Sequence, residues 1–474
     1  MLSKYRILLL NPPGKLTYSR DYFCSKVTKT GYIEHPVDLL ILSGILSEKY
    51  EISFVDAIIE NLSEKKIADK IINGKFDYVI FLTGSSSFCD DSVFFRGIKS
   101  LVPGIKLIGI GDILRDSEIF LNSSWIDAVI LDFTNTDIIS FIEKKYESIS
   151  SMYYRANKEV FLKKNVLSGN KALRVFEIPV PKHEIFLNDR YLFPFSRHPR
   201  YATVLTDFGC PFNCSFCLYC TLGFKLRSLE NVAEELKYLK KLGITEIFFK
   251  DQAFGAVKSR TLDLCSIMQA IGEFSWSCFM RADSADSEIL AAMKRSGCHT
   301  IMFGVESADQ IILNRYNKAL KAGVVQNAFE LCRNEGIETL GIFMLGFPEE
   351  SDASCRKTSE MPFELKCDYI SLNIFVPKYE TPARKWLGNK ISDFDWKTGN
   401  LDQSGVLPFK SYAAIPTARI KRIKDHALIK FYLRPNYILR RLRKVKSLFE
   451  LKMLFRMGFS LFSPLLESLF SWLK

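Results

Sequence analysis

Short apolar runs alternate along the chain with amphipathic segments of helical period. In the first 150 residues, runs of this kind predict strands at residues 6–10, 52–56, 78–82, 106–110 and 128–131. Stretches such as 38–49 and 91–101 follow them with the spacing of helices that bury one face. Strands that alternate with helices are typical of parallel sheets with crossover connections. We therefore predict an α/β fold that begins with a doubly wound, Rossmann-like domain over residues 1–148.

A second series of strands and helices begins near residue 200. Its strands are predicted at residues 202–206, 246–250, 275–280, 300–305, 339–345 and 369–375. Six such units predict a partial (βα)6 barrel over residues 200–385. Residues 149–199 have no strong period apart from a hairpin near 153–161, so we expect a connector there. Residues 386–474 are expected to form a C-terminal helical extension.

Small and polar residues gather where the strands of the first domain end. Doubly wound sheets bind ligands in the crevice at these C-terminal strand ends. Glycine and serine can also do no more than terminate a strand, and that reading is open for each loop taken alone. Four loops together favour a ligand, and the candidate contacts are Asn11, Asp56, Ser85, Gly109 and Gly111.

Three cysteines follow the first barrel strand directly. Cys210, Cys214 and Cys217 have the spacing C-x-x-x-C-x-x-C, at the strand end where parallel barrels place their chemistry. Thiolates are the ligands of iron–sulfur clusters, and three thiolates leave one iron of a four-iron cluster open. That iron could chelate S-adenosylmethionine. Zinc is the main alternative, although no second C-x-x-C pair or His cluster occurs downstream.

At this loop the sequence resembles the radical SAM superfamily, whose signature is C-x-x-x-C-x-aromatic-C, with Phe216 in the aromatic position. The likeness continues at residues 248–251, 281–283, 304–307 and 341–350. It implies an enzyme that holds a 4Fe-4S cluster and cleaves S-adenosylmethionine to release a deoxyadenosyl radical. It also implies an electron donor such as flavodoxin or ferredoxin.

The same resemblance implies contacts to S-adenosylmethionine. Phe216 would pack beside the adenine, and Arg281 and Glu306 would hold the methionine carboxylate or the ribose. A structural ion pair is the alternative for these two charged residues, because buried charges at strand ends are often paired within the protein. The remaining contacts implied in this way are Asp251, Gly341 and Gly346.

The pairing of a doubly wound domain with this barrel is similar to the cobalamin-binding group of the superfamily. That group includes methylases of unactivated carbon and the anaerobic oxidative cyclase of porphyrin synthesis. The likeness implies that the crevice residues of the first domain bind cobalamin, and that a methyl group is added to a carbon from which the radical has removed hydrogen. The chain departs from the group's pattern because it has no Asp-x-His-x-x-Gly.

Several alternatives to this function stay open. The first domain could have lost cobalamin, and the reaction could be a cyclisation or rearrangement without methyl transfer. Outside the enzyme class, the chain could be a cobalamin or iron–sulfur scaffold or sensor, although the strand-end motifs argue against that. Cys220, Cys278 and Cys298 could donate hydrogen or bind iron, but inert core thiols are the favoured interpretation.

The positive charge of the chain is concentrated at its C-terminal end. Residues 415–474 contain fourteen Lys/Arg and three Asp/Glu, which is +11 of the formal net charge of +12. Interleaved Leu, Phe and Trp predict basic amphipathic helices, for which membrane contact and packing on the barrel are equally weighted readings and nucleic-acid binding ranks last. Lys452, Arg456 and Glu467 disfavour a spanning helix.

The substrate and the compartment are inferred only indirectly. The apolar and basic tail favours a small or lipid-like metabolite. The first residues contain an apolar run without a small-residue cleavage site, and the twelve cysteines are then expected to be reduced. We therefore predict a cytoplasmic protein, with peripheral attachment to the inner face of the membrane as the alternative.

Overall fold

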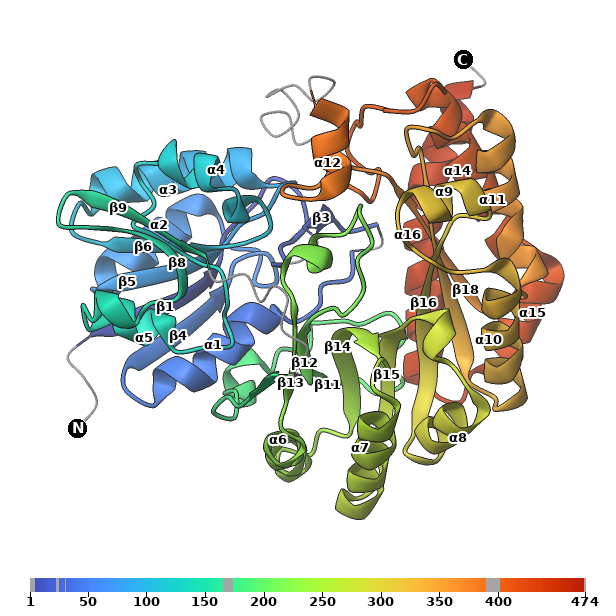
Figure 1. The fold of residues 1–474 in the computed structure, drawn as a ribbon, viewed down its shortest axis with the longest axis horizontal. Coiled ribbons are helices and arrows are strands. Elements are labelled where there is room, and N and C mark those ends of the chain that lie inside the picture. Colours follow the sequence, from blue (N-terminus) through green and yellow to red (C-terminus); the bar gives the residue numbers. More distant parts are fainter. Residues whose placement is uncertain (1–4, 23–24, 30, 165–173, 389–400, 473–474) are drawn as a thin grey trace.

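The computed structural model describes residues 5–22, 25–29, 31–164, 174–388 and 401–472, with side chains described as far as residue 460. Figure 1 shows two sheets beside each other, the first in blue and teal and the second in green to orange. The C-terminal helices, in red, lie at the β18 end of the second sheet. The mixed α/β class predicted from the sequence is confirmed.

The first sheet has the strand order β4-β1-β5-β6-β7-β8-β9. Its strands from β4 to β7 are parallel neighbours, as the prediction of a doubly wound domain requires. Their bounds are β1 (Arg6–Asn11), β4 (Glu51–Asp56), β5 (Tyr78–Leu82), β6 (Lys106–Ile110) and β7 (Ala128–Ile130).

Helices cover both faces of this sheet because successive side chains of a strand point to opposite faces. Ile7 and Leu9 pack against α1 (Val37–Ser47) and α5 (Asp137–Ile142). Leu8 and Leu10 pack against the other face, where the helices are α2 (Glu64–Gly74) and α3 (Phe88–Leu101). The short α4 (Ser117–Leu121) follows β6. Near-continuous apolar strands are therefore buried on both sides.

The first sheet extends beyond the boundary predicted at residue 148. β8 (Ser151–Ala156) pairs antiparallel with β7, and β9 (Glu159–Lys164) pairs antiparallel with β8. The hairpin predicted near residues 153–161 is thus part of the first domain and not of a connector. The antiparallel pairing needs only a short connection, which is why no helix precedes it.

The second sheet has six parallel strands in the order β11-β14-β15-β16-β17-β18, which is the predicted partial barrel. Each predicted strand is present. The bounds are β11 (Tyr201–Val204), β14 (Glu246–Phe254), β15 (Ser275–Met280), β16 (Cys298–Glu306), β17 (Glu338–Leu345) and β18 (Tyr369–Ile374). Helices pack on its outer face: α6 (Leu229–Lys241), α7 (Lys258–Ile271), α8 (Ser287–Arg295), α10 (Ala322–Asn334) and α11 (Asp352–Glu364).

The chain also forms two small sheets. β12 (Asp207–Gly209) and β13 (Phe224–Arg227) are antiparallel partners on either side of the cysteine loop, and β10 (Arg174–Phe176) pairs with β13. β2 (Tyr18–Ser19) and β3 (Lys26–Val27) form a short hairpin in the first domain. α9 (Gln310–Arg315) and α12 (Pro382–Leu387) follow β16 and β18.

The C-terminal extension is helical, as predicted, and much of it packs on the barrel. It contains α14 (Thr417–Tyr432), α15 (Pro435–Lys444) and α16 (Leu448–Trp472). Ile420 and Phe431 of α14 are fully buried. No helix among the described residues is long and apolar enough to cross a membrane. Glu467 lies outside the described side chains.

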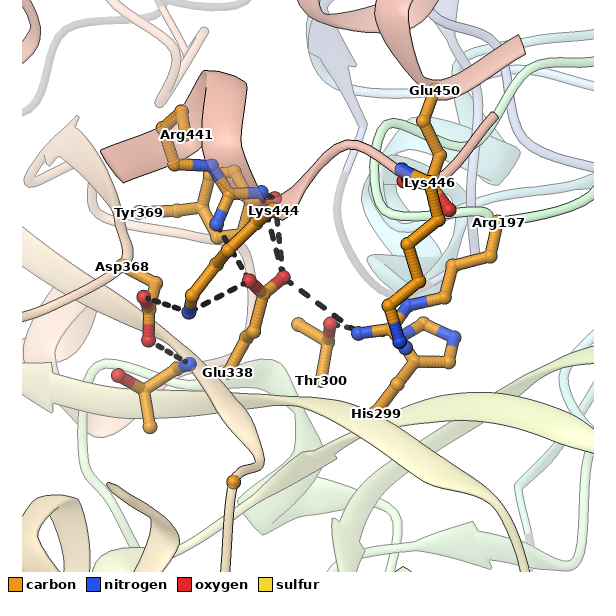
Figure 2. Close-up of polar contacts among 12 residues, drawn as sticks. Arg197, His299, Thr300, Glu338, Asp368, Tyr369, Arg441, Lys444, Lys446 and Glu450 are labelled. Atoms are coloured by element: carbon orange, nitrogen blue, oxygen red, sulfur yellow. Dashed lines mark hydrogen bonds and ion pairs between the residues drawn. The ribbon is translucent and has the colours of Figure 1, made fainter. Parts of the chain in front are cut away.

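An ion-pair cluster fixes α15 to the start of the barrel strands (Figure 2). Glu338, the first residue of β17, accepts hydrogen bonds from Arg441 Nη1 at 2.6 Å and Lys444 Nζ at 3.1 Å. Lys444 also pairs with Asp368 at 3.1 Å. Burial raises the pKa of Glu338, but the two cations outweigh it and lower the pKa to about 2. Part of the positive charge of the C-terminal segment is therefore paired with carboxylates inside the protein.

Candidate functional site

A cavity of about 410 Å³ lies between the two sheets and is walled by both halves of the chain. All three predicted ligand cysteines line it, together with Phe216, Arg281 and Glu306. From the barrel interior come Phe279, Met302, Leu340, Ile342 and Ile370. The N-terminal half contributes Asp21, Lys26, Thr28, Lys29, Tyr32 and Glu34, none of which the sequence had singled out.

The cysteine loop is held at this cavity by backbone contacts. The amide of Cys210 donates to Gly223 O at 3.0 Å, and the amide of Ser215 donates to Tyr316 O at 2.9 Å. Gly209 has φ +90, and a Cβ there would lie 1.9 Å from Gly223 O, so only glycine permits this close pairing of β12 and β13. The loop therefore leaves its strand in one defined direction.

The three thiols lie close enough to influence one another. Burial raises the pKa of Cys210 to about 12, and burial also raises the pKa of Cys217, with further contributions from Cys210 and Cys214. Such thiols become thiolates when a metal replaces the proton. Among the described residues, no three His, Cys, Asp or Glu side chains are placed to hold a single metal ion. Three thiols on one loop suit a cluster, because each thiolate of a cluster binds a different iron.

Two cationic side chains, those of Arg281 and Lys318, lie beside the cysteines. Arg281 Nη1 is 3.6 Å from Cys214 Sγ, and its Nη2 donates to Lys318 O at 2.9 Å. Its guanidinium also lies 3.9 Å from the ring centre of Phe212 and pairs with Asp283. The positive charge thus faces the position where thiolates would carry negative charge.

Glu306 ends β16 in a strained conformation. Its φ is +69, a value rare for residues other than glycine, and the pairing register shifts between Gly304 and Glu306. The carboxylate accepts a hydrogen bond from Lys318 Nζ at 3.1 Å, and both side chains are buried. Strain of this kind is often found at functional sites. Lys318 itself lies in a loop without a motif, so only its contact reveals it.

The other residues predicted to touch S-adenosylmethionine do not line the cavity. Asp251 accepts from the Thr206 amide at 2.7 Å, which ties β14 to the segment before the cysteines. A Cβ on Gly341 would lie 2.9 Å from Cys367 Sγ, and Gly346 needs its φ of +89. These three residues have sufficient structural reasons, and a ligand role for them stays a prediction. Phe216, by contrast, packs near Phe347 and faces the cavity.

The residues predicted to contact cobalamin meet at the strand ends of the first sheet but lie outside the cavity wall. Asn11 Oδ1 accepts from Arg20 Nη1 at 3.0 Å, and Arg20 Nη2 pairs with Asp91 Oδ1 at 2.6 Å. Asp56 accepts from the Tyr191 hydroxyl at 2.7 Å. Their polar groups are therefore bound within the protein.

Ser85, Gly109 and Gly111 are similarly occupied. Ser85 donates to Asp112 through both its amide and its hydroxyl at 2.8 Å. A Cβ on Gly109 would lie 2.4 Å from Leu114, and one on Gly111 would lie 1.9 Å from Thr83 O. Direct contact between these strand ends and a cofactor stays a prediction.

The chain itself covers the crevice of the first sheet. Ser25, next to β3, hydrogen bonds Ser86 at 2.5 Å, and its amide lies 3.4 Å from Asp112 Oδ2. A Cβ on Gly84 would lie 2.2 Å from Ser25, so the covering segment approaches the strand ends as closely as glycine allows. The segment that follows, from Lys26 to Glu34, contributes residues to the cavity wall instead.

Charged contacts join the two halves across the cavity. Lys250 of β14 pairs with Asp21 at 3.1 Å and with Glu34. Burial lowers the pKa of Lys250, but the two carboxylates outweigh it and raise the pKa above its usual value. Thr28 Oγ1 is buried in the same wall and has no hydrogen-bond partner among the described residues. A buried hydroxyl without a partner costs about 1–3 kcal/mol, which a ligand could offset.

Histidine does not contribute to the described cavity wall. His35 is buried between the rings of Tyr191 and Tyr201, and burial lowers its pKa to about 3. His183 and His299 pair with glutamates away from the cavity, and His198 and His426 are also outside its lining. The described cavity wall thus has no histidine, and the sequence has no Asp-x-His-x-x-Gly.

Comparison with known families gives the same assignment. Residues 205–361 match the radical SAM superfamily. Residues 205–361 therefore form a radical SAM domain, and the chain is an enzyme. This assignment sets aside the reading of the chain as a non-enzymatic scaffold or sensor. Cys278 and Cys298 lie in the core between strands and helices, and Cys220 is outside the cavity lining.

Two relatives align with most of this chain. It is 28% identical to an uncharacterized methyltransferase of Pyrococcus horikoshii, over 94% of this chain and 95% of the relative. It is 22% identical to the anaerobic magnesium-protoporphyrin IX monomethyl ester cyclase of Cereibacter sphaeroides, over 80% of this chain and 61% of that enzyme. The two relatives have different reactions in their names.

Two solved structures share the fold of this chain. The cobalamin-dependent radical enzyme OxsB, with aqua-cobalamin and S-adenosylmethionine bound, matches with a TM-score of 0.66 and 15% identity over 97% of this chain and 72% of its own. The methyltransferase TsrM from Kitasatospora setae, with cobalamin and a [4Fe-4S] cluster, matches with a TM-score of 0.63 and 14% identity over 82% and 78%. The match to OxsB includes both large sheets, because it covers 97% of this chain.

Proposed function

We propose that this protein is a cobalamin-dependent radical SAM enzyme that methylates an unactivated carbon of a small or lipid-like metabolite. One observation carries the proposal: the cysteine loop, a cationic pocket and a wall from the N-terminal half all face one cavity. When bound, a 4Fe-4S cluster would supply the electron that cleaves S-adenosylmethionine, and cobalamin would carry the methyl group.

The barrel side of the cavity has the groups needed to hold a cluster and S-adenosylmethionine. Cys210, Cys214 and Cys217 would ligate three irons. Arg281 and Lys318 would face the methionine carboxylate, because they place two positive charges beside the cysteines. Glu306 would accept hydrogen bonds from the amino group or the ribose. The aromatic ring of Phe216 would pack beside the adenine.

The N-terminal side of the cavity suits a large, partly apolar cofactor with amide groups. Tyr32 offers an aromatic surface, and Lys26 and Thr28 offer hydrogen bonds. The unpartnered Thr28 hydroxyl is the observation that supports a ligand here. In this proposal cobalamin contacts Lys26, Thr28 and Tyr32. These residues follow Ser25 in the chain, and they would contact the cofactor more directly than the strand ends of the first sheet do.

The barrel interior would bind the carbon skeleton of the substrate. Phe279, Met302, Leu340 and Ile342 make an apolar wall next to the charged pocket. Such a wall excludes water and keeps polar hydrogen donors away from a reactive radical. An apolar substrate with one polar end would match this division.

Anaerobic reconstitution of the full chain with iron, sulfide and hydroxocobalamin tests the proposal. Dithionite and S-adenosylmethionine are then added, and retained cobalt and deoxyadenosine are measured. Cobalt together with deoxyadenosine supports the proposal, whereas deoxyadenosine without cobalt removes cobalamin from it. Absence of both signals contradicts the function as a whole.

A cyclase or other radical reaction without methyl transfer is the second candidate, because one relative is named as a cyclase. S-adenosylmethionine labelled on its methyl group separates the two reactions. Reconstituted enzyme incubated with a metabolite extract should move the label into a product if it methylates carbon. A product formed with deoxyadenosine but without label would favour the second candidate.

A further inference from the structure

The outer face of α16 carries large apolar side chains in solvent. Leu448, Phe455 and Phe459 are 85%, 68% and 77% exposed. Their spacing of seven and four residues places them on one side of the helix, and Lys452 lies between them on the same side. Three such side chains on one exposed stripe are costly unless another surface covers them.

The opposite face of α16 is fixed to the protein. Met453 is buried, and its carbonyl accepts a hydrogen bond from the Tyr32 hydroxyl at 3.2 Å. Met457 lines the cavity described above. The exposed stripe is therefore the outward side of a docked helix whose inner side closes part of the active-site wall.

The charged side chain within the stripe is positive, and Glu450 of the same helix accepts a hydrogen bond from the Lys446 amide at 2.9 Å. Lys452 and Arg443 are exposed, and no acidic side chain among the described residues pairs with either of them. Arg441 and Lys444, in contrast, are bound to Glu338 in the cluster of Figure 2. Of the two exposed cations, Lys452 lies within the apolar stripe itself.

Phenylalanine and leucine beside lysine and arginine are the composition of helices that lie in the headgroup region of anionic bilayers. A cation near such a surface is attracted by its negative potential. No described helix is long and apolar enough to cross a bilayer. We propose that the outer face of α16 docks on an anionic lipid surface, with Phe455 and Phe459 inserted among the headgroups and Lys452 on the lipid phosphates.

Co-sedimentation of the reconstituted full chain with vesicles tests this docking surface. We expect binding to vesicles of equal parts phosphatidylglycerol and phosphatidylcholine, much weaker binding to phosphatidylcholine alone, and release at high salt. The double variant Phe455→Ser/Phe459→Ser should weaken binding at least about tenfold. Lys452→Gln should weaken it about fivefold.

A matched control uses apolar residues that are equally exposed elsewhere. Val93 on α3 is 68% exposed and Ile311 on α9 is 74% exposed. The double variant Val93→Ser/Ile311→Ser should bind vesicles like the unchanged protein. All variants should still form deoxyadenosine, because the substituted side chains point away from the cavity; this readout also verifies that they fold.

Three outcomes would overturn the proposal. The first is the absence of binding to either kind of vesicle. The second is binding that the control variant loses as strongly as the Phe455/Phe459 variant. The third is a concentration-dependent dimer in sedimentation velocity that Phe455→Ser/Phe459→Ser converts to monomer without vesicle binding, which would assign the stripe to a second copy of this chain.

Discussion

The strand ends of the two sheets carry similar residues but lie in different surroundings. In the first sheet, Asn11, Asp56 and Ser85 are hydrogen bonded within the protein, and Ser25 packs against the loop that carries Ser85. In the barrel, Arg281 and Glu306 face an open cavity with the cysteine loop beside them. The comparison teaches that a polar strand end predicts a ligand only where the chain leaves it uncovered.

Loss of one cysteine should have the largest effect on the barrel side. Cys214→Ala removes one of three thiolates, so we expect no stable cluster and at least about a thousandfold less deoxyadenosine, since the reaction needs the bound iron. Iron content and product formation are the measurements. Cys220→Ala, in the same loop but outside the cavity lining, should retain both; a loss of iron in that variant would make Cys220 a ligand.

Removing a buried partner on the crevice side should affect stability instead. Asp91→Ala leaves the Arg20 guanidinium buried and unpaired, and we expect the free energy of unfolding to fall by about 3–5 kcal/mol. Chemical denaturation measures this change. S-adenosylmethionine binding by the folded fraction should be unaltered, and a selective loss of binding would show that the crevice contacts a ligand after all.

Neutralising Glu306 should weaken the binding of S-adenosylmethionine rather than lower the stability of the fold. Glu306→Gln keeps the size of the side chain but removes a charged acceptor at the cavity, so we expect affinity for S-adenosylmethionine to fall about tenfold or more. Equilibrium binding to the reconstituted enzyme measures the effect. An unchanged affinity, together with a large loss of stability, would make the Glu306–Lys318 pair purely structural.

Substitutions of Thr28 and Thr83 are expected to have the smallest effects, and they compare a residue of the cavity wall with a residue of the crevice. Thr28→Val removes a buried hydroxyl without a described partner, so we expect the apo protein to keep its stability and retention of cobalamin to fall a few-fold. Thr83→Val removes a hydroxyl that donates to Asp91 at 2.7 Å, so stability should fall by about 1 kcal/mol with cobalamin retention unaltered. Equal effects of the two substitutions on retention would contradict the placement of cobalamin along residues 26–32.

The fold could be predicted from the sequence because it follows from local pattern. Each strand of the barrel coincides with an apolar run, and the cysteine loop follows β11 and β12 as its motif requires. The boundary at residue 148 failed because an antiparallel hairpin leaves no helical signal between its strands. The covering of the crevice could not be predicted for another reason. Ser25 and Ser86, which hydrogen bond to each other, are sixty-one positions apart in the sequence.

The sequence by itself therefore determined the α/β class, the order of the elements and the loop that carries the cysteines. Periodicity and motif spacing are properties of neighbouring residues, and they survive without knowledge of the fold. The tertiary structure alone decided that Lys318 joins Glu306, that Thr28 faces the cavity, and which cations of the tail are paired. Those facts depend on burial and on contacts between distant segments, which determine whether a polar group binds the protein or is left for a ligand.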